Sequence, residues 1–296
     1  MKKHLASLIF IAATLSTQAQ NVASTANITS GGLQAGNGGI RNAFYGYYAG
    51  YGNTGSQNTF LGHQSGEDNG SGDDNTYIGF QSGGNNTDGS GNAYIGTRAG
   101  YENWGNNNTY IGSFSGFDTY GGSGNVFIGH LSGSNSQDPI NNKLYIENSG
   151  SDKPLIWGDF ANDKLKFNGK VGIGYAFGDF PTTAGGINVS GYNLFVNGGI
   201  LTEEVRVILK NQWADYVFAD NYNLKPLKEL EQFIKQNGHL PNVPSAAQVK
   251  ENGIEVGEII TIQQEKIEEL TLHLINQEKQ LEELKAQINL LLQSQN

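Results

Sequence analysis

The first half of the chain repeats one pattern of polar and hydrophobic positions. Each unit reads Asn, then Ala, Thr or Val, then Phe or Tyr, an aliphatic residue, Gly, two variable positions, Ala or Ser, and Gly, with Tyr45 in the aliphatic position of the first unit. Successive units begin 16 or 17 residues apart, which is too short a period for a helix-containing repeat or a propeller blade. The pattern predicts one coil of a β-solenoid or β-roll per unit. The units start at Asn42, Asn58, Asn75, Asn92, Asn108 and Asn125.

The adjacent aromatic and aliphatic positions of each unit predict opposite faces of a short strand, because strand side chains alternate. The glycine after them permits a positive φ or a tight corner. These corner glycines are Gly46, Gly62, Gly79, Gly96, Gly112 and Gly129. The stretches between units are rich in Gly, Asn, Ser and Asp, which favour turns. One coil of this size encloses little volume, so we expect other copies of the chain to cover the aromatic ladder.

The Asn-x-aromatic-Ile-Gly-x-x-Ala/Ser-Gly unit resembles the head repeat of YadA-type trimeric autotransporter adhesins. The resemblance covers residues 42–133 and implies a head in which three left-handed β-rolls pack about a threefold axis. This chain departs from the family in its slightly longer repeat and in its aromatic third position. A shared head fold is expected, whereas a shared ligand does not follow.

The N-terminal residues 1–19 are typical of a secretory signal. Lys2 and Lys3 precede an apolar stretch, Leu5–Leu15, and a small-residue cleavage site, Thr17–Ala19. The apolar stretch is too short to span a bilayer, which needs about 20 residues. We therefore expect an exported protein, at the cell surface or extracellular, with no membrane-spanning segment in the mature chain. Residues 20–41 are expected to form a linker.

Residues 134–212 contain short apolar strings between turns, which predict a connector made of short strands. Either this connector is a small β domain, or it is a neck in which three chains intertwine their strands; the neighbouring parts of the chain favour the neck. The strings are Leu144–Ile146, Leu155–Trp157, Val171–Ile173, Leu194–Val196 and Val205–Val207.

Residues 213–258 predict short helices. Leu227–Ile234 has helical spacing that stops at Asn237 and Gly238, and Ser245 is a plausible N-cap of the next helix.

Residues 259–296 carry a heptad pattern that predicts about 48 Å of coiled-coil helix. The first core positions are Ile260, Ile267, Leu274, Leu281 and Ile288, and the second are Gln263, Leu270, Gln277, Leu284 and Leu291. Ile at the first position with Leu at the second favours dimers in general. The two glutamines, together with the resemblance of the head, favour a trimer. A helix that folds back on its own chain is the alternative.

Trp213–Phe218, the loop His239–Ala246 and the coil together resemble the C-terminal chaperone segment of phage tail-spike and fibre proteins of the endosialidase type, in shortened form. In that family the serine of a Ser-Asp pair, ahead of Leu-Lys, is the self-cleavage nucleophile. The nearest match here is Ala219 and Asp220, ahead of Leu224 and Lys225, with a spacing one residue longer. Because alanine has no hydroxyl, the resemblance implies an assembly role without self-cleavage.

Composition excludes several classes of protein. The chain has 18 Lys and Arg against 28 Asp and Glu, a net charge of -10. Nucleic acids and anionic membranes need clustered cations, so neither is an expected partner. The absence of cysteine excludes disulfides, a thiolate nucleophile and a Cys-based zinc site. Of 42 glycines, 28 lie in residues 31–133 and none follows Thr261, so the chain has at least two unlike parts.

We predict no catalytic, cofactor or metal site. His63 and His130 share the sixth repeat position, but four coils, about 19 Å, separate them. Symmetry copies of either could meet on an axis, although a variable surface position is the simpler interpretation. The Gly-x-Gly at Gly172–Gly174 lacks the helix and acidic residue of a nucleotide site. The turn aspartates lack the register of calcium-binding β-rolls; they are Asp68, Asp73, Asp74, Asp88 and Asp118.

These features predict an exported homotrimeric fibrous surface protein, not an enzyme, that binds a host, another cell or a polysaccharide. Loop aromatics could form stacking platforms for sugars or only cover neighbouring coils; they are Tyr51, Tyr101, Trp104, Phe117 and Tyr120. One alternative is a tail-fibre-like receptor-binding component of a phage or contractile injection apparatus, although cytoplasmic assembly fits poorly with a signal segment. Another is a glycan-cleaving tail-spike-like enzyme, which needs paired carboxylates in a groove.

Overall fold

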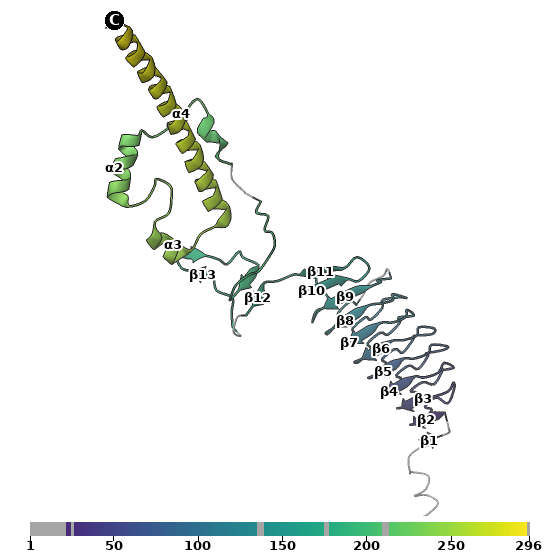
Figure 1. Cartoon of the computed structure of the whole chain (residues 1–296). Helices are drawn as coiled ribbons and strands as arrows, with labels where there is room; N and C mark the ends of the chain where they lie inside the picture. The colour runs from purple at the N-terminus through teal and green to yellow at the C-terminus, as the bar shows by residue number, and fades with distance from the viewer. Residues whose placement is uncertain (1–21, 25–26, 135–138, 175–177, 209–212, 295–296) are drawn as a thin grey trace, which may run out of the picture. The chain divides into compact units, whose positions relative to one another are not determined.

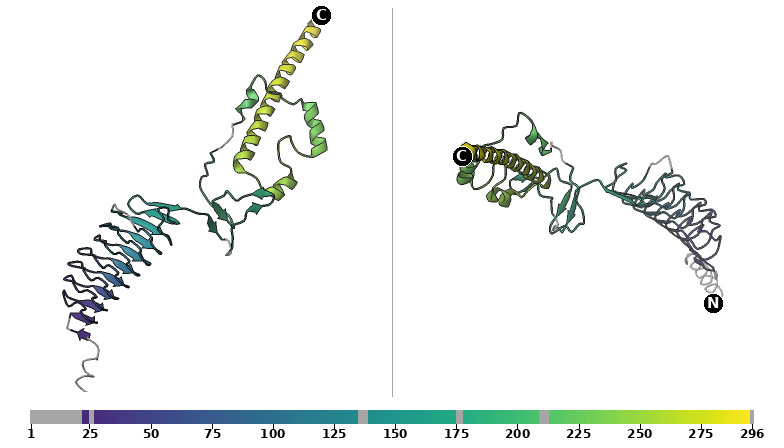
Figure 2. Two further views of the ribbon diagram at one scale, coloured as in Figure 1. Left: turned by 180° about the vertical axis from the view of Figure 1, so that it is seen from behind. Right: turned by 45° about the horizontal axis from the view of Figure 1, so that its top comes forward.

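The computed structural model describes residues 22–24, 27–134, 139–174, 178–208 and 213–294. The predicted signal segment, residues 1–19, lies outside them. The chain divides into two compact units, Met1–Gly169 and Lys170–Asn296. The first unit contains a stack of strands and the second contains the helices (Figures 1 and 2).

The first unit is a β-solenoid, as the repeats predict. Its eleven-stranded sheet follows chain order (Figure 1). Strands β2 to β9 pair in parallel, while β1, β10 and β11 pair antiparallel at the two ends. The strands are β1 (Val22–Ser24), β2 (Ile28–Gly31), β3 (Asn42–Tyr45), β4 (Thr59–Leu61), β5 (Thr76–Ile78), β6 (Ala93–Ile95), β7 (Thr109–Ile111), β8 (Val126–Ile128), β9 (Lys143–Ile146), β10 (Ile156–Asp159) and β11 (Lys164–Phe167).

The aromatic ladder is the core of a single chain. Its six rings are 0% exposed, and neighbouring ring centroids lie 4.8–5.1 Å apart, close to the spacing of the strands themselves. The prediction that other copies of the chain cover this ladder is therefore wrong. The rings are Phe44, Phe60, Tyr77, Tyr94, Tyr110 and Phe127.

The second glycine of each repeat explains why no partner is needed. Gly83 has a φ of +58°, and a Cβ there would lie 2.5 Å from the Tyr77 ring. At Gly100 the same atom would lie 2.3 Å from the Tyr94 ring. The backbone opposite the strand thus packs directly on the ring, so one aromatic side chain spans the distance between the strand and this turn. A coil of this length closes around a single ring.

The first asparagine of each repeat forms a second buried ladder, in which all six side chains are at most 3% exposed. Asn75 is representative. Its Oδ1 accepts the backbone N–H of Asn92 at 2.9 Å, and its Nδ2 donates to the carbonyl of Gly89 at 2.8 Å. Each asparagine therefore joins successive coils and satisfies a turn carbonyl that would otherwise be buried without a partner.

The corner glycines after the strands have φ values between +114° and +145°. A Cβ on Gly62 would lie 2.3 Å from the carbonyl oxygen of Gly79 in the next coil. Both the backbone conformation and this close approach require glycine.

The sheet continues beyond residues 42–133. Ile28 lies opposite Asn42, so residues 28–41, which we expected to be a linker, form a further coil. At the other end Tyr145 of β9 packs on Phe127 at a centroid distance of 5.0 Å. Strands β9 to β11 then form an antiparallel meander that ends the solenoid.

The second unit begins with two small sheets. Strand β12 (Val171–Ile173) pairs in parallel with β15 (Leu194–Val196), and β13 (Thr183–Ala184) pairs antiparallel with β14 (Ile187–Asn188). Val205–Val207, which we predicted as a strand, is not part of any strand in the structure.

The helices of this unit are the 3₁₀ helix η1 (Ala214–Phe218), α2 (Leu227–Asn237), α3 (Ala246–Asn252) and α4 (Val256–Ser294). As predicted, α2 ends at Gly238, with a φ of 76°. Ser245 caps α3: its Oγ accepts the N–H of Gln248 at 3.3 Å, while its own N–H donates to Gln248 Oε1 at 2.8 Å. The 39-residue α4 confirms the predicted C-terminal helix.

Candidate interaction surfaces

Helix α4 has one face covered by its own chain and one face open. On the covered face η1 packs with Ala214 and Val217 at most 1% exposed, and Glu265 and Glu268 of α4 are 6% and 5% exposed. The predicted core residues on the open face are 42–63% exposed, although heptad core residues are apolar because they pack against other helices. These residues are Ile260, Ile267, Leu270, Leu274, Leu281, Leu284, Ile288 and Leu291. We call them the apolar seam.

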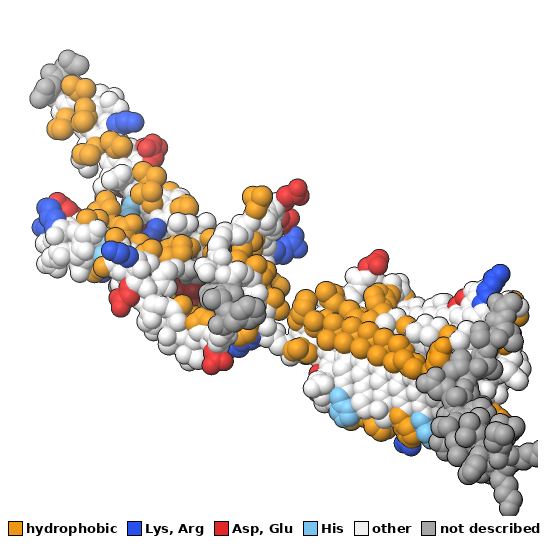
Figure 3. Space-filling model, turned by 90° about the horizontal axis from the view of Figure 1, so that it is seen from below, with side chains coloured by type: hydrophobic (Ala, Val, Ile, Leu, Met, Phe, Trp, Pro, Cys, Tyr) orange, Lys and Arg blue, Asp and Glu red, His pale blue; other side chains and the backbone are white. Residues whose placement is uncertain are grey.

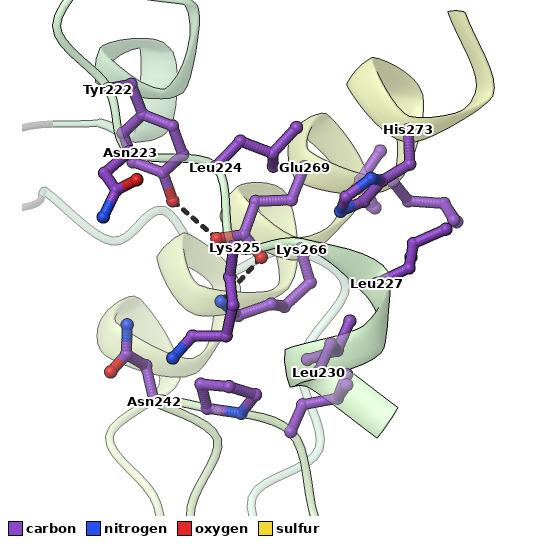
Figure 4. A pocket seen from close by; sticks show the side chains of 14 residues that line it. Tyr222, Asn223, Leu224, Lys225, Leu227, Leu230, Asn242, Lys266, Glu269 and His273 are labelled. Atoms are coloured by element: carbon purple, nitrogen blue, oxygen red, sulfur yellow. Dashed lines mark hydrogen bonds and ion pairs between the residues drawn. The ribbon is translucent and has the colours of Figure 1, made fainter. Parts of the chain in front are cut away.

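A polar cluster holds residues 214–222, the segment that covers α4, against the helix. The hydroxyl of Tyr216 donates to the Glu265 carboxylate, and that of Tyr222 donates to Glu269 Oε1 at 2.5 Å. Lys266 Nζ lies between the two carboxylates, 2.6 Å from Glu265 and 2.8 Å from Glu269 (Figure 4 shows Tyr222, Lys266 and Glu269). Charge-assisted hydrogen bonds of this kind are stronger than neutral ones. They fix which face of α4 the segment covers.

The electrostatics keep this cluster in its hydrogen-bonded form near neutral pH. The hydrogen bond to Glu265 and partial burial raise the pKa of Tyr216 to about 12. Burial acts to raise the pKa of Glu265, but hydrogen bonds from Lys266, Tyr216 and Asn242 outweigh it, so this pKa is lowered. For Lys266, burial acts to lower the pKa, but pairing with the glutamates outweighs it and the pKa is raised. The lysine and Glu265 are therefore charged and Tyr216 is protonated.

An apolar groove of about 500 Å³ lies between α4 and the segment that leads into α2 (Figure 4). Its lining includes the seam residues Ile267 and Leu270, together with Leu227 and Leu230 of α2. Helix α2 contains no buried residue, and Leu227 is 45% exposed. The groove therefore widens the open apolar surface beside the seam.

The outer face of the solenoid sheet is the other large apolar surface. The aliphatic repeat position points outward, and Tyr45, Leu61, Ile95 and Ile111 are 39–49% exposed. Figure 3 shows apolar side chains gathered in a band along the solenoid. Extended exposed apolar surfaces mark sites of association. The aliphatic ladder, rather than the aromatic one, is the exposed apolar face of the solenoid.

Each of the five predicted platform aromatics contacts another aromatic ring, at centroid distances of 4.9–5.8 Å. The contacts are Tyr51 with Tyr48, Tyr101 with Phe117, and Trp104 with Tyr120. Asn85 contacts both Tyr101 and Trp104, through its Nδ2 and its backbone carbonyl respectively.

Sequence analysis missed an aromatic column at the sixth and seventh repeat positions. The His63 ring lies 5.0 Å from Tyr47 and 5.4 Å from Phe80, so this histidine contacts aromatic rings. The Arg98 guanidinium lies 5.8 Å from the Phe114 ring centroid. The signal was available, because residues at equal repeat positions stack on one another even where their identities vary.

Within the described ranges no group of three or more His, Asp and Glu side chains is placed to hold a metal ion. In the same part of the chain no helix has both the length and the apolar character needed to cross a bilayer. Ala219, the residue aligned with the self-cleaving serine, directly follows η1. Comparison of the chain with protein-family models, curated proteins and solved structures gave no match.

Proposed function

We propose that this protein is an exported, homotrimeric fibrous surface protein. Its solenoid binds a glycan or protein on another cell or host, and α4 assembles the three chains. The observation that carries this proposal is the division of α4 into two faces. The chain covers one face with η1 and leaves the apolar seam open from Ile260 to Leu291. Because the chain packs its own segment on the opposite face of α4, this arrangement disfavours the alternative in which α4 folds back on its own chain to bury the seam.

Two further features support association of several chains. Burial of apolar surface contributes roughly 25 cal/mol per Å², and the seam and the sheet's outer face both offer such surface. Gln263 and Gln277, together with the resemblance of the repeats to a trimeric head, favour three copies over two. Export rests on the signal pattern of residues 1–19. Self-cleavage is not part of this function, because Ala219 lacks a nucleophile.

The test is a pair of double variants in α4, measured by light scattering on protein collected outside the cell. The N-terminal sequence of that protein should begin at Gln20. Ile267→Asp with Leu274→Asp places charges in the seam and should reduce the mass to one chain. Asn276→Asp with Asn289→Asp adds the same charges away from the seam and should leave the mass unchanged. An unchanged mass in the seam variant would mean that α4 does not assemble the chains.

A further inference from the structure

The turn side of the solenoid carries a recess of about 450 Å³, separate from both apolar surfaces described above. Its volume lies in the range of small-ligand sites, about 300–1,000 Å³. Two of its lining residues are glycines, and a Cβ on Gly70 would lie 2.2 Å from the carbonyl oxygen of Thr87 in the next coil. The lining residues are Gly52, Asp68, Gly70, Asn85, Thr87 and Trp104.

Trp104 forms a fixed wall of this recess. Its Nε1 donates to the backbone carbonyl of Asn85 at 2.9 Å, and Tyr120 lies beside it at a centroid distance of 5.8 Å. The side chain is nevertheless 47% exposed. A rigid, flat, half-exposed indole binds a ligand at low entropic cost, because its orientation is set before binding.

The polar side chains of the recess present acceptors to a ligand. The exposed Asp68 carboxylate has no side-chain hydrogen bond or ion pair among the described residues. Asn85 donates its Nδ2 to the Tyr101 hydroxyl at 3.1 Å, which leaves its Oδ1 free to accept. The Thr87 hydroxyl donates to Asp88 at 3.3 Å and keeps its lone pairs. A matching ligand must therefore carry several donors.

The charge of the recess further restricts the classes of ligand that it can bind. Among the described residues that line the recess there is no lysine or arginine. Asp68 lines it, and Asp88 and Glu102 accept hydrogen bonds from its lining residues Thr87 and Asn85, so its surroundings are acidic. A phosphate, sulfate or uronate would find no cation here, and the carbonyls of a peptide would find few donors. A neutral sugar combines hydroxyl donors with an apolar ring face. We propose that this recess binds a neutral saccharide, with one sugar ring stacked on Trp104 and hydroxyls donating to Asp68, Asn85 and Thr87.

This site deepens the surface-binding function proposed above and rests on it. The six described lining residues of the recess, however, all belong to one chain. Its test can therefore fail or succeed independently of trimer formation.

The experiment is isothermal titration calorimetry of the mature full-length chain with four neutral hexasaccharides: cellohexaose, laminarihexaose, mannohexaose and N-acetylchitohexaose. Hexagalacturonate serves as the acidic comparison. At least one neutral hexasaccharide should bind saturably and more tightly than hexagalacturonate. Trp104→Ala and Asp68→Asn should each weaken that binding by about tenfold. Tyr51→Ala removes an aromatic side chain that is 57% exposed and does not line the recess, and it should leave binding unchanged.

Trp104→Phe keeps a stacking ring and should bind within about threefold of the native chain, which separates stacking from loss of fold. The proposal is overturned if no neutral hexasaccharide binds, if hexagalacturonate binds more tightly, or if Trp104→Ala binds as well as the native chain. Sedimentation of the same samples separates the two proposals. A single chain that binds saccharide refutes only the assembly, whereas a trimer that binds none refutes only the recess.

Discussion

At the residue scale, one ring and one glycine decide how a coil closes. Alternation along the strand predicted that the aromatic and aliphatic positions face opposite ways, but both are apolar, so alternation could not say which face lies inside. The answer comes from Gly83 and its equivalents, where the backbone approaches the ring too closely for any Cβ. That contact joins residues on opposite sides of the coil, so the sequence pattern alone could not predict it.

A pair of alanine variants tests this account. Gly83 and Gly121 both have positive φ values, +58° and +78°, but only at Gly83 would a Cβ meet a ring. Gly121→Ala should lower the free energy of unfolding by about 1–2 kcal/mol through backbone strain alone. Gly83→Ala should lower it by about 1–3 kcal/mol more, through overpacking against Tyr77. Urea unfolding measures both, and equal losses would contradict closure of the coil by the ring.

At the element scale, the sequence predicted the apolar seam of α4 but not the face that the chain itself covers. Its seam follows a local heptad, so Ile260 to Leu291 could be assigned from the sequence. Its covered face could not be, because Tyr216 and Tyr222 reach Glu265 and Glu269 across 49 and 47 residues. Hydrogen bonds over such separations leave no periodic pattern. The capping boundaries of α2 and α3 were predictable because Gly238 and Ser245 act locally.

The polar cluster predicts how the covering of α4 depends on pH. The pKa of Glu265 is lowered from 4.5 in the folded chain, so its contribution is present above pH 4.5 and is lost as the pH falls through the folded value. The pKa of Tyr216 is raised from 10.0 to about 12, so its contribution is present below pH 10 and is lost as the pH rises toward 12.

The melting temperature of the native chain and of Glu265→Gln, measured from pH 3 to pH 11, tests this prediction. The difference between the two chains should be largest near neutral pH and should shrink below pH 4.5, because the variant has no charge to lose. A difference that stays constant across the acid range would show that the Glu265 charge does not stabilise the covering segment.

At the scale of the whole molecule, the solenoid buries its aromatic core within one chain, whereas α4 leaves its apolar seam exposed. The repeats predicted the solenoid because each coil uses the same residues. The added coil at residues 28–41 escaped prediction because it keeps only the Gly-x-x-Ala-Gly half of the pattern, at Gly32–Gly36, and has Ile28, Ser30 and Gly31 in the asparagine, aromatic and aliphatic positions. Two extended apolar surfaces are exposed in this chain, the outer face of the solenoid sheet and the seam of α4. The proposed association of three copies would bury the seam.

The mass of the mature chain in solution tests this central claim most directly. Sedimentation equilibrium at micromolar concentration requires no label, no variant and no knowledge of the ligand. The account predicts three times the mass of the chain that begins at Gln20. The mass of a single chain at that concentration would contradict it, because the seam from Ile260 to Leu291 would then remain exposed to water without a partner.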